Sequence, residues 1–195
     1  MRTNVRIKAD QARTMRCKNL IVVLENPKTI ENVGSTLRNI DALGVEKLYV
    51  VDGNKLLPGT WEDMRKRNSL NKISASAVKW KFVRTFPDTQ SCINHLKYKQ
   101  FVSMVTSPHI KGRTNTILED GKYTQSRLAV WFGNETQGVS DLAIENSIAC
   151  INIPMCGIIE SLNLGTSTGI VMYEVTKQRR NWVKVKYEKI NRSHR

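Results

Sequence analysis

This chain lacks the closely spaced cysteines and histidines of a metal site. Its 195 residues include four cysteines and three histidines, with no Cys-x-x-Cys pair and with the histidines far apart at positions 95, 109 and 194. Structural zinc sites place Cys and His about two to five residues apart, and disulfide frameworks use closely spaced cysteines. We therefore expect reduced thiols and no bound metal.

Long apolar runs are also absent. No stretch approaches the roughly 18 consecutive apolar residues of a membrane span, and the start, MRTNVRIKAD, lacks the apolar segment of a secretory signal. We expect a cytoplasmic protein without a membrane anchor. Apolar residues make up 40% and charged residues 25% of the chain, which excludes collagen-like, coiled-coil and wholly disordered classes.

The glycine-rich loops that bind phosphates are not present. A dinucleotide site, or a Rossmann-type methyltransferase, would carry a G-x-G-x-x-G turn after the first strand, where this chain reads ENPKTIENVG. A P-loop would continue into Lys and Ser or Thr, whereas Gly133–Gly138 is followed by Val139 and Ser140. Both nucleotide-binding classes are therefore excluded.

Positive charge is abundant and lies mainly at the two ends. The chain has 31 Lys and Arg against 17 Asp and Glu, for a net charge of +14, yet residues 19–176 contribute only +2. We expect a basic N-terminal extension over residues 1–18, a domain over 19–180 and a basic C-terminal tail over 181–195. Such ends attract polyanions because each Lys or Arg at a phosphate releases counterions. The alternative is that they serve solubility alone.

Short β-branched runs alternate with segments of helical periodicity along the chain. This alternation predicts an α/β fold, with a mainly parallel sheet and helices on both faces. The expected strands cover residues 19–25, 46–52, 80–83, 101–106, 127–132 and 149–153, and the expected helices cover 29–43, 61–68, 89–96, 140–146 and 161–180.

Three short motifs place small and polar residues at the ends of predicted elements. The first puts Asn32 and Arg38 on the helix expected over residues 29–43. A spacing of six sets them about 120° apart, so they flank one side of that helix. The second is Gly133–Gly138, after a predicted strand, and the third runs from Ile153 to Asn163. Taken singly, helix capping, solvation or an ordinary turn explains each motif.

In this order and spacing the three motifs resemble those of the SpoU branch of the SPOUT superfamily, RNA ribose 2′-O-methyltransferases that use S-adenosylmethionine. They are similar to N-x-G-x-x-x-R, F-G-x-E-x-x-G and I-P-M-x-G-x-x-x-S-L-N. The matching residues are Asn32, Gly34 and Arg38; Phe132, Gly133, Glu135 and Gly138; and Ile153, Pro154, Met155, Gly157, Ser161, Leu162 and Asn163. The resemblance covers residues 19–180. Two departures are Asn39, where Thr is commoner, and Leu164–Gly169, which is more polar than the usual Val/Ala-rich helix.

The resemblance implies a C-terminal trefoil knot, the SPOUT fold, which is a rare exception to unknotted topology. It also implies a homodimer whose active site is close to the interface, near the helix that carries Asn32 and Arg38. The cofactor would be S-adenosyl-L-methionine. The residues that the resemblance assigns to its adenine and ribose are Gly133, Ile153 and Leu162, with Thr106 as a further candidate.

The resemblance assigns activation of the ribose hydroxyl to Arg38. A guanidinium with a pKa above about 12 has no lone pair to accept a proton. Either its surroundings help Arg38 to exchange a proton, or it stabilises the forming alkoxide while another group accepts the proton; we favour the second. Asn32 and Asn163 would orient Arg38 and the RNA, Ser161 would bind in the cofactor pocket, and Glu135 would fix its loop or position the partner's residues.

The expected substrate is structured RNA held by the basic ends, with tRNA favoured over rRNA because the chain lacks the separate N-terminal RNA-binding domain of several rRNA-modifying relatives. An alternative is a non-catalytic RNA-binding or assembly factor that retains the fold. A further alternative is that the methyl acceptor is a base or a protein. Mapping the modified group would distinguish this alternative from ribose methylation.

Overall fold

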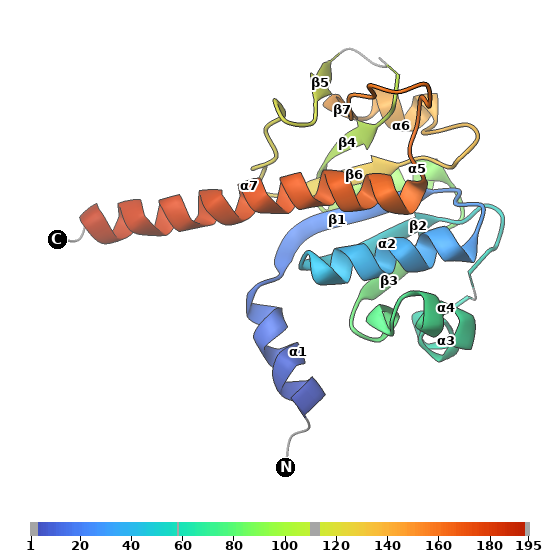
Figure 1. The fold of residues 1–195 in the computed structure, drawn as a ribbon, viewed down its shortest axis with the longest axis horizontal. Helices are drawn as coiled ribbons and strands as arrows, with labels where there is room; N and C mark the ends of the chain where they lie inside the picture. The colour runs from blue at the N-terminus through green and yellow to red at the C-terminus, as the bar shows by residue number, and fades with distance from the viewer. Residues whose placement is uncertain (1–3, 58, 110–113, 194–195) are drawn as a thin grey trace.

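The computed structural model describes residues 4–57, 59–109 and 114–193. At its centre is a seven-stranded sheet in the order β3-β2-β1-β6-β4-β7-β5, and all of its strand pairs are parallel (Figure 1). The strands are β1 (Cys17–Glu25), β2 (Val45–Val51), β3 (Phe82–Phe86), β4 (Val102–Thr106), β5 (Asn115–Ile117), β6 (Leu128–Phe132) and β7 (Ala149–Asn152). The helices are α1 (Asn4–Thr14), α2 (Ile30–Ala42), α3 (Trp61–Lys66), α4 (Asn68–Ile73), the 3-10 turn η1 (Ala77–Lys79), α5 (Thr89–Tyr98), α6 (Asp141–Glu145) and α7 (Leu164–Ser193).

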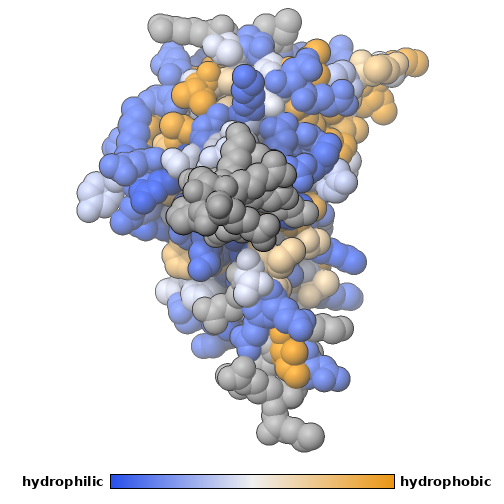
Figure 2. Space-filling view, turned by 90° about the vertical axis from the view of Figure 1, so that its left-hand side faces the viewer, coloured by the Kyte–Doolittle hydropathy of each residue, from blue (hydrophilic) through white to orange (hydrophobic). Residues whose placement is uncertain are grey.

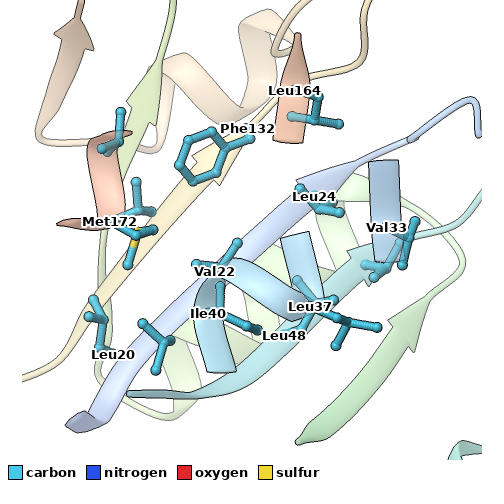
Figure 3. Close-up of a cluster of buried hydrophobic side chains, with 14 of the residues drawn as sticks. Leu20, Val22, Leu24, Val33, Leu37, Ile40, Leu48, Phe132, Leu164 and Met172 are labelled. Atoms are coloured by element: carbon cyan, nitrogen blue, oxygen red, sulfur yellow. The ribbon is translucent and has the colours of Figure 1, made fainter. Parts of the chain in front are cut away.

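Each face of the sheet has its own apolar core. Successive side chains of a strand point to opposite faces, so Val22 of β1 belongs to one core and Val23 to the other. The first core packs the sheet against α2 and α7, including Leu37 and Met172 (Figure 3). The second packs it against α5 and α6. The predicted α/β fold, with a parallel sheet and helices on both faces, is confirmed.

Helix α2 follows the expected range closely. The Thr29 side chain caps its start by accepting from the Asn32 N–H at 3.3 Å. Val33, Leu37 and Ile40 recur at helical spacing and are fully buried. Gly44, with φ of +76°, follows the end of the helix in the left-handed region that glycine adopts at little cost.

Helix α7 begins later than the sequence suggests, because Ser161–Asn163 lies outside it. The Asn163 carboxamide oxygen accepts from the Gly165 N–H at 2.8 Å and so satisfies a free donor at the helix start. A Cβ on Gly165 would lie 2.8 Å from the Ser35 Cβ. The Asn39 amide donates to the Gly165 carbonyl oxygen at 2.6 Å. Asn39 and the Leu164–Gly169 segment, the two departures from the family pattern, are therefore in contact. The contact lies where α7 packs closely on α2.

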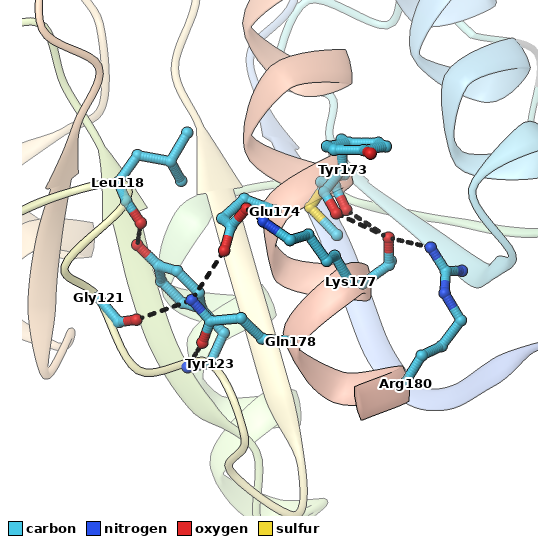
Figure 4. Close-up of polar contacts among 10 residues, drawn as sticks. Leu118, Gly121, Tyr123, Tyr173, Glu174, Lys177, Gln178 and Arg180 are labelled. Carbon is cyan, nitrogen blue, oxygen red and sulfur yellow. Dashed lines mark hydrogen bonds and ion pairs between the residues drawn. The ribbon is translucent and has the colours of Figure 1, made fainter. Parts of the chain in front are cut away.

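The middle of α7 is tied to the rest of the domain by polar contacts, several of which are drawn in Figure 4. Gln178 donates to the carbonyl oxygen of Gly121 at 3.0 Å, and Arg180 donates to that of Leu43 at 3.1 Å. Arg179 donates to three further backbone oxygens, at 2.6, 3.0 and 3.4 Å. These two bases of the C-terminal segment therefore hold the helix in place, and α7 continues to residue 193.

Other elements differ from the sequence-based expectation at their ends. The strand expected over residues 80–83 is β3, two residues later, and residues 4–14 form the unexpected helix α1. The polar stretch 107–126 contains the three-residue edge strand β5. In the described part of the chain, no helix is both long and apolar enough to cross a bilayer.

Candidate functional site

A pocket of about 250 Å³ opens where β4, β6 and β7 end. The carboxyl ends of parallel strands meet at one edge of a sheet, the usual place for a ligand in such folds. Predicted cofactor residues from all three strand ends line this pocket, as do two residues of the third motif: Thr106, Gly133, Ile153, Ser161 and Leu162. Glu135 of the second motif lines it too.

The Gly133–Gly138 loop forms one wall of the pocket and is internally closed. A Cβ on Gly133 would lie 1.8 Å from the carbonyl carbon of Gly138, so no other residue fits there without a change in the loop. The Asn134 side chain accepts from the backbone N–H groups of Thr136 and Gln137 at 3.0 and 2.8 Å. Gly138 has a φ of +70°. Gly133 and Gly138 thus bring no side chain to this wall of the pocket.

A buried carboxylate that no motif of the sequence indicates holds the end of that loop. Glu25, at the end of β1, is 2% exposed. It accepts from the Ser140 N–H at 2.8 Å and from the Ser140 hydroxyl at 2.6 Å. The Thr89 hydroxyl donates to it as well. Because Ser140 also caps α6, Glu25 joins the loop, α6 and the start of α5.

The first motif is joined to the other two through Asn32. Its side-chain amide donates to the Glu135 carboxylate. Its carbonyl oxygen accepts from the Asn163 amide at 3.1 Å. Asn32 is 8% exposed, and a buried amide with both ends bonded has a fixed orientation. Three predicted site residues that are far apart in sequence therefore form one network beside the pocket.

Arg38 lies apart from this network within the single chain. It follows Asn32 by six residues on α2, which is about 9 Å along the helix axis. Its side chain is exposed, and among the described residues it is not one that lines the pocket. The structure therefore brings together eight of the nine predicted site residues and leaves Arg38 on the surface.

The pocket lining is acidic. It includes Glu135 and Glu160, and also His109, which lies three residues after the end of β4. None of the described residues that line the pocket is Lys or Arg. Glu160 and His109 were not predicted as site residues. A lining of carboxylates and backbone groups suits a ligand that carries positive charge and neutral hydrogen-bonding groups.

The fold and the pocket together define a class: a parallel α/β protein that binds a small ligand in loops at the carboxyl ends of its strands. Residues 19–173 match the SpoU rRNA Methylase family, and the chain belongs to that family. The family predicted from the three motifs is thereby confirmed.

Similar proteins carry related names. A Thermus thermophilus tRNA (guanosine(18)-2′-O)-methyltransferase is 30% identical over 164 residues, which cover 84% of this chain and 77% of that protein. The crystal structure of the Aquifex aeolicus TrmH/SpoU tRNA modifying enzyme has a TM-score of 0.72 at 28% identity, covering 90% of this chain and 84% of that one. The Streptomyces viridochromogenes methyltransferase AviRb, solved with AdoMet, shares the fold at 24% identity and a TM-score of 0.66, covering 83% of this chain and 58% of that one.

Proposed function

We propose that this chain is an S-adenosylmethionine-dependent methyltransferase that modifies a ribose 2′-hydroxyl in structured RNA, with tRNA favoured over rRNA. The observation that carries the proposal is the network of Asn32, Glu135 and Asn163, which joins all three motifs at the edge of the pocket. The activity in the name of the Thermus relative, which is similar over most of both chains, supports the reaction type and tRNA.

The pocket fits S-adenosyl-L-methionine by its chemistry. The backbone-lined wall at Gly133, with Ile153 and Leu162, would bind adenine and ribose, and Thr106 is a further candidate. The acidic side chains of Glu135 and Glu160 suit the sulfonium and ammonium charges. When bound, this cofactor supplies an electrophilic methyl group.

The chain's own residues would prepare the ribose oxygen. A neutral hydroxyl is a poor nucleophile, so the site must hold it in line with the methyl group and stabilise the negative charge that develops on it. Arg38 would supply that stabilisation as a cationic donor, while another group accepts the proton. Asn32 and Asn163 would orient the RNA and Arg38, Ser161 would bind the cofactor, and Glu135 would fix its own loop through Asn32.

A homodimer would bring Arg38 to a pocket. Exposed apolar side chains lie next to the site and along the start of α7: Ile158, Ile159 and Leu162, followed by Ile170 and Tyr173. Such exposure is typical of a surface that another protein covers. Arg38, on the neighbouring helix α2, would then lie near the interface and reach the pocket from there. The trefoil knot is proposed on family membership alone.

The basic ends are proposed as part of the RNA-binding surface. Hydrophilic residues predominate on the face seen along α7 from its C-terminal end (Figure 2). Because Arg179 and Arg180 are engaged with backbone oxygens, RNA binding at this end would depend on the bases beyond them. The division at residues 18 and 180 and the cytoplasmic location stay predictions.

Nucleoside analysis of RNA tests the proposed function. Total tRNA and rRNA from cells with and without this chain would be digested to nucleosides and compared by mass spectrometry. We expect one 2′-O-methylated nucleoside to disappear from tRNA when the chain is absent. Identical 2′-O-methyl profiles, or loss of a base-methylated nucleoside instead, would contradict the proposal.

A further inference from the structure

We propose that the surface formed by α3, η1 and β3 binds unpaired nucleotides of the RNA substrate. The surface is defined by Trp61, Arg65, Lys66, Lys79, Trp80 and Phe82, and the inference rests on the proposed function. None of the three motifs falls in segment 53–80. It lies outside the cofactor pocket and outside the basic ends.

Aromatic rings on this surface are open to solvent. Trp80 and Phe82 are each 41% exposed. The ring of Phe82 lies 5.8 Å from that of Trp61, and the Arg65 guanidinium lies 4.8 Å from the Trp61 ring centroid. Unpaired bases stack on exposed aromatic rings and on guanidinium planes. The arrangement supplies both kinds of stacking partner on adjacent elements.

The positive charge of the domain core is concentrated in the same segment. Residues 53–80 carry six Lys and Arg against two acids, a net charge of +4, whereas residues 19–176 as a whole have +2. The rest of that core is therefore net negative. Arg65, Lys66 and Lys79 are exposed and would meet phosphates beside the stacked bases.

The surface adjoins the side of α2 that carries Arg38. Gly34, Arg38 and Asp41 follow one another at spacings of four and three, so they lie along one side of the helix. A Cβ on Gly34 would lie 2.5 Å from Ile73 of α4, and Asp41 forms an ion pair with Lys81 at 2.9 Å. Arg38 therefore lies between these two contacts.

One element of the surface, η1, packs directly against α2. The chain that passes this side of α2 runs from Ile73 through η1 to Lys81, with Lys79 and Trp80 in between. Figure 1 shows α3, α4 and β3 grouped at this edge of the sheet. An RNA strand whose ribose reaches Arg38 would therefore pass over the aromatic and basic residues.

A second copy of the chain is a less suitable occupant. Two copies that met symmetrically through this surface would bring like charges together, which is unfavourable for a protein interface. A polyanion gains from the same charges. The exposed aromatic rings alone would suit either occupant, so the charge decides in favour of RNA.

Two variants of the full-length protein test the proposal: Lys66→Glu with Lys79→Glu, and Trp80→Ala with Phe82→Ala. The matched control is Tyr98→Ala with Lys99→Glu at the C-terminal end of α5, a helix that packs on the opposite face of the sheet. There the Lys99 amine lies 4.9 Å from the Tyr98 ring centroid, and Tyr98 is 79% exposed. The control thus removes a similar cation and ring elsewhere.

The readout is the dissociation constant for unfractionated tRNA at several salt concentrations, with S-adenosylmethionine affinity by calorimetry as a check on folding. We expect each surface variant to bind tRNA about tenfold more weakly or worse. The charge variant should also reduce the salt slope by about two. Cofactor affinity should be unchanged, and the control should bind tRNA within about twofold of the unaltered protein.

Two results would overturn the inference. One is that the unaltered protein binds tRNA and the surface variants bind it with the same dissociation constant. The other is a change in oligomeric state, measured by light scattering, that accounts for any loss of binding in the variants, since the surface would then be an interface between copies. An unaltered protein that binds no RNA would instead refute the proposed function.

Discussion

Glu25→Gln is the substitution that isolates the carboxylate behind the Gly133–Gly138 loop. The amide has nearly the shape of the carboxylate, so packing is kept. It can still accept from the Ser140 and Thr89 hydroxyls through its remaining oxygen. The other oxygen, which accepts from the Ser140 N–H at 2.8 Å, becomes an NH₂ group that can only donate.

The expected loss of stability follows from this one hydrogen bond, in which two donors would face each other. A hydrogen bond to a charged group contributes about 1.5–3 kcal/mol, and a buried donor left without a partner costs about 1–3 kcal/mol. Glu25 is 2% exposed, so water does not replace the lost acceptor. We expect the free energy of unfolding to fall by about 2–3 kcal/mol. The loop should also lose its fixed end, which would weaken S-adenosylmethionine binding.

Urea unfolding followed by circular dichroism measures the first effect, and calorimetric titration of S-adenosylmethionine measures the second. Thr89→Val removes one donor on the α5 side of Glu25 and should cost about 1 kcal/mol of stability while leaving cofactor affinity unchanged. Glu145→Gln, at an exposed position of α6, serves as the charge control. A Glu25→Gln protein within about 0.5 kcal/mol of the unaltered stability would refute the reasoning.

Three further predictions concern the pocket, the ion pair of a buried lysine and alkaline pH. Gly133→Ala should abolish measurable S-adenosylmethionine binding in calorimetry, because its Cβ would lie 1.8 Å from the Gly138 carbonyl carbon; retained affinity would contradict this. Asp41→Asn should lower stability to urea by about 2 kcal/mol, since the fully buried Lys81 side chain, 2.9 Å from the Asp41 carboxylate, would keep an oxygen acceptor but lose the opposite charge; unchanged stability would contradict the role of the pair. Burial raises the pKa of Tyr123 to about 12, above its value of about 10 in the unfolded chain. The stability that the protonated Tyr123 contributes is therefore complete below about pH 10, and about 2 kcal/mol of it is lost as the pH rises to about 12. In urea titrations at several pH values, Tyr123→Phe should reduce this loss of stability at alkaline pH.

Elements with strong apolar periodicity could be predicted from the sequence, and those without it could not. The run NLIVVLE and the spacing of Val33, Leu37 and Ile40 predicted β1 and α2 within a few residues. Helix α1 was not predicted, because Asn4–Thr14 is mostly polar and its two larger apolar residues, Val5 and Ile7, are two apart and do not share a helix face. Helix α7 starts three residues later than its sequence predicts, because Ser-Leu-Asn is equally compatible with the segment that precedes and caps a helix.

The residues of the candidate site could be predicted from the sequence, but the hydrogen bonds between them could not. The motif residues were found from their order and spacing, but the role of Asn32 as the link between Glu135 and Asn163 depends on hydrogen bonds between residues more than 100 apart in sequence. Glu25 gave no signal, because a single carboxylate at a strand end is common and its partners come from two other segments. Contacts of that kind are set by tertiary packing.

Methyl transfer by the purified protein, with and without Arg38, tests the central claim most directly. Labelled S-adenosylmethionine and unfractionated tRNA would be incubated with the unaltered protein and with Arg38→Ala, and the labelled nucleoside identified. We predict a 2′-O-methylnucleoside from the unaltered protein and at least about a hundredfold less from Arg38→Ala, with cofactor affinity retained. An unaltered protein that binds the cofactor yet labels no RNA, or labels a base, would contradict the account.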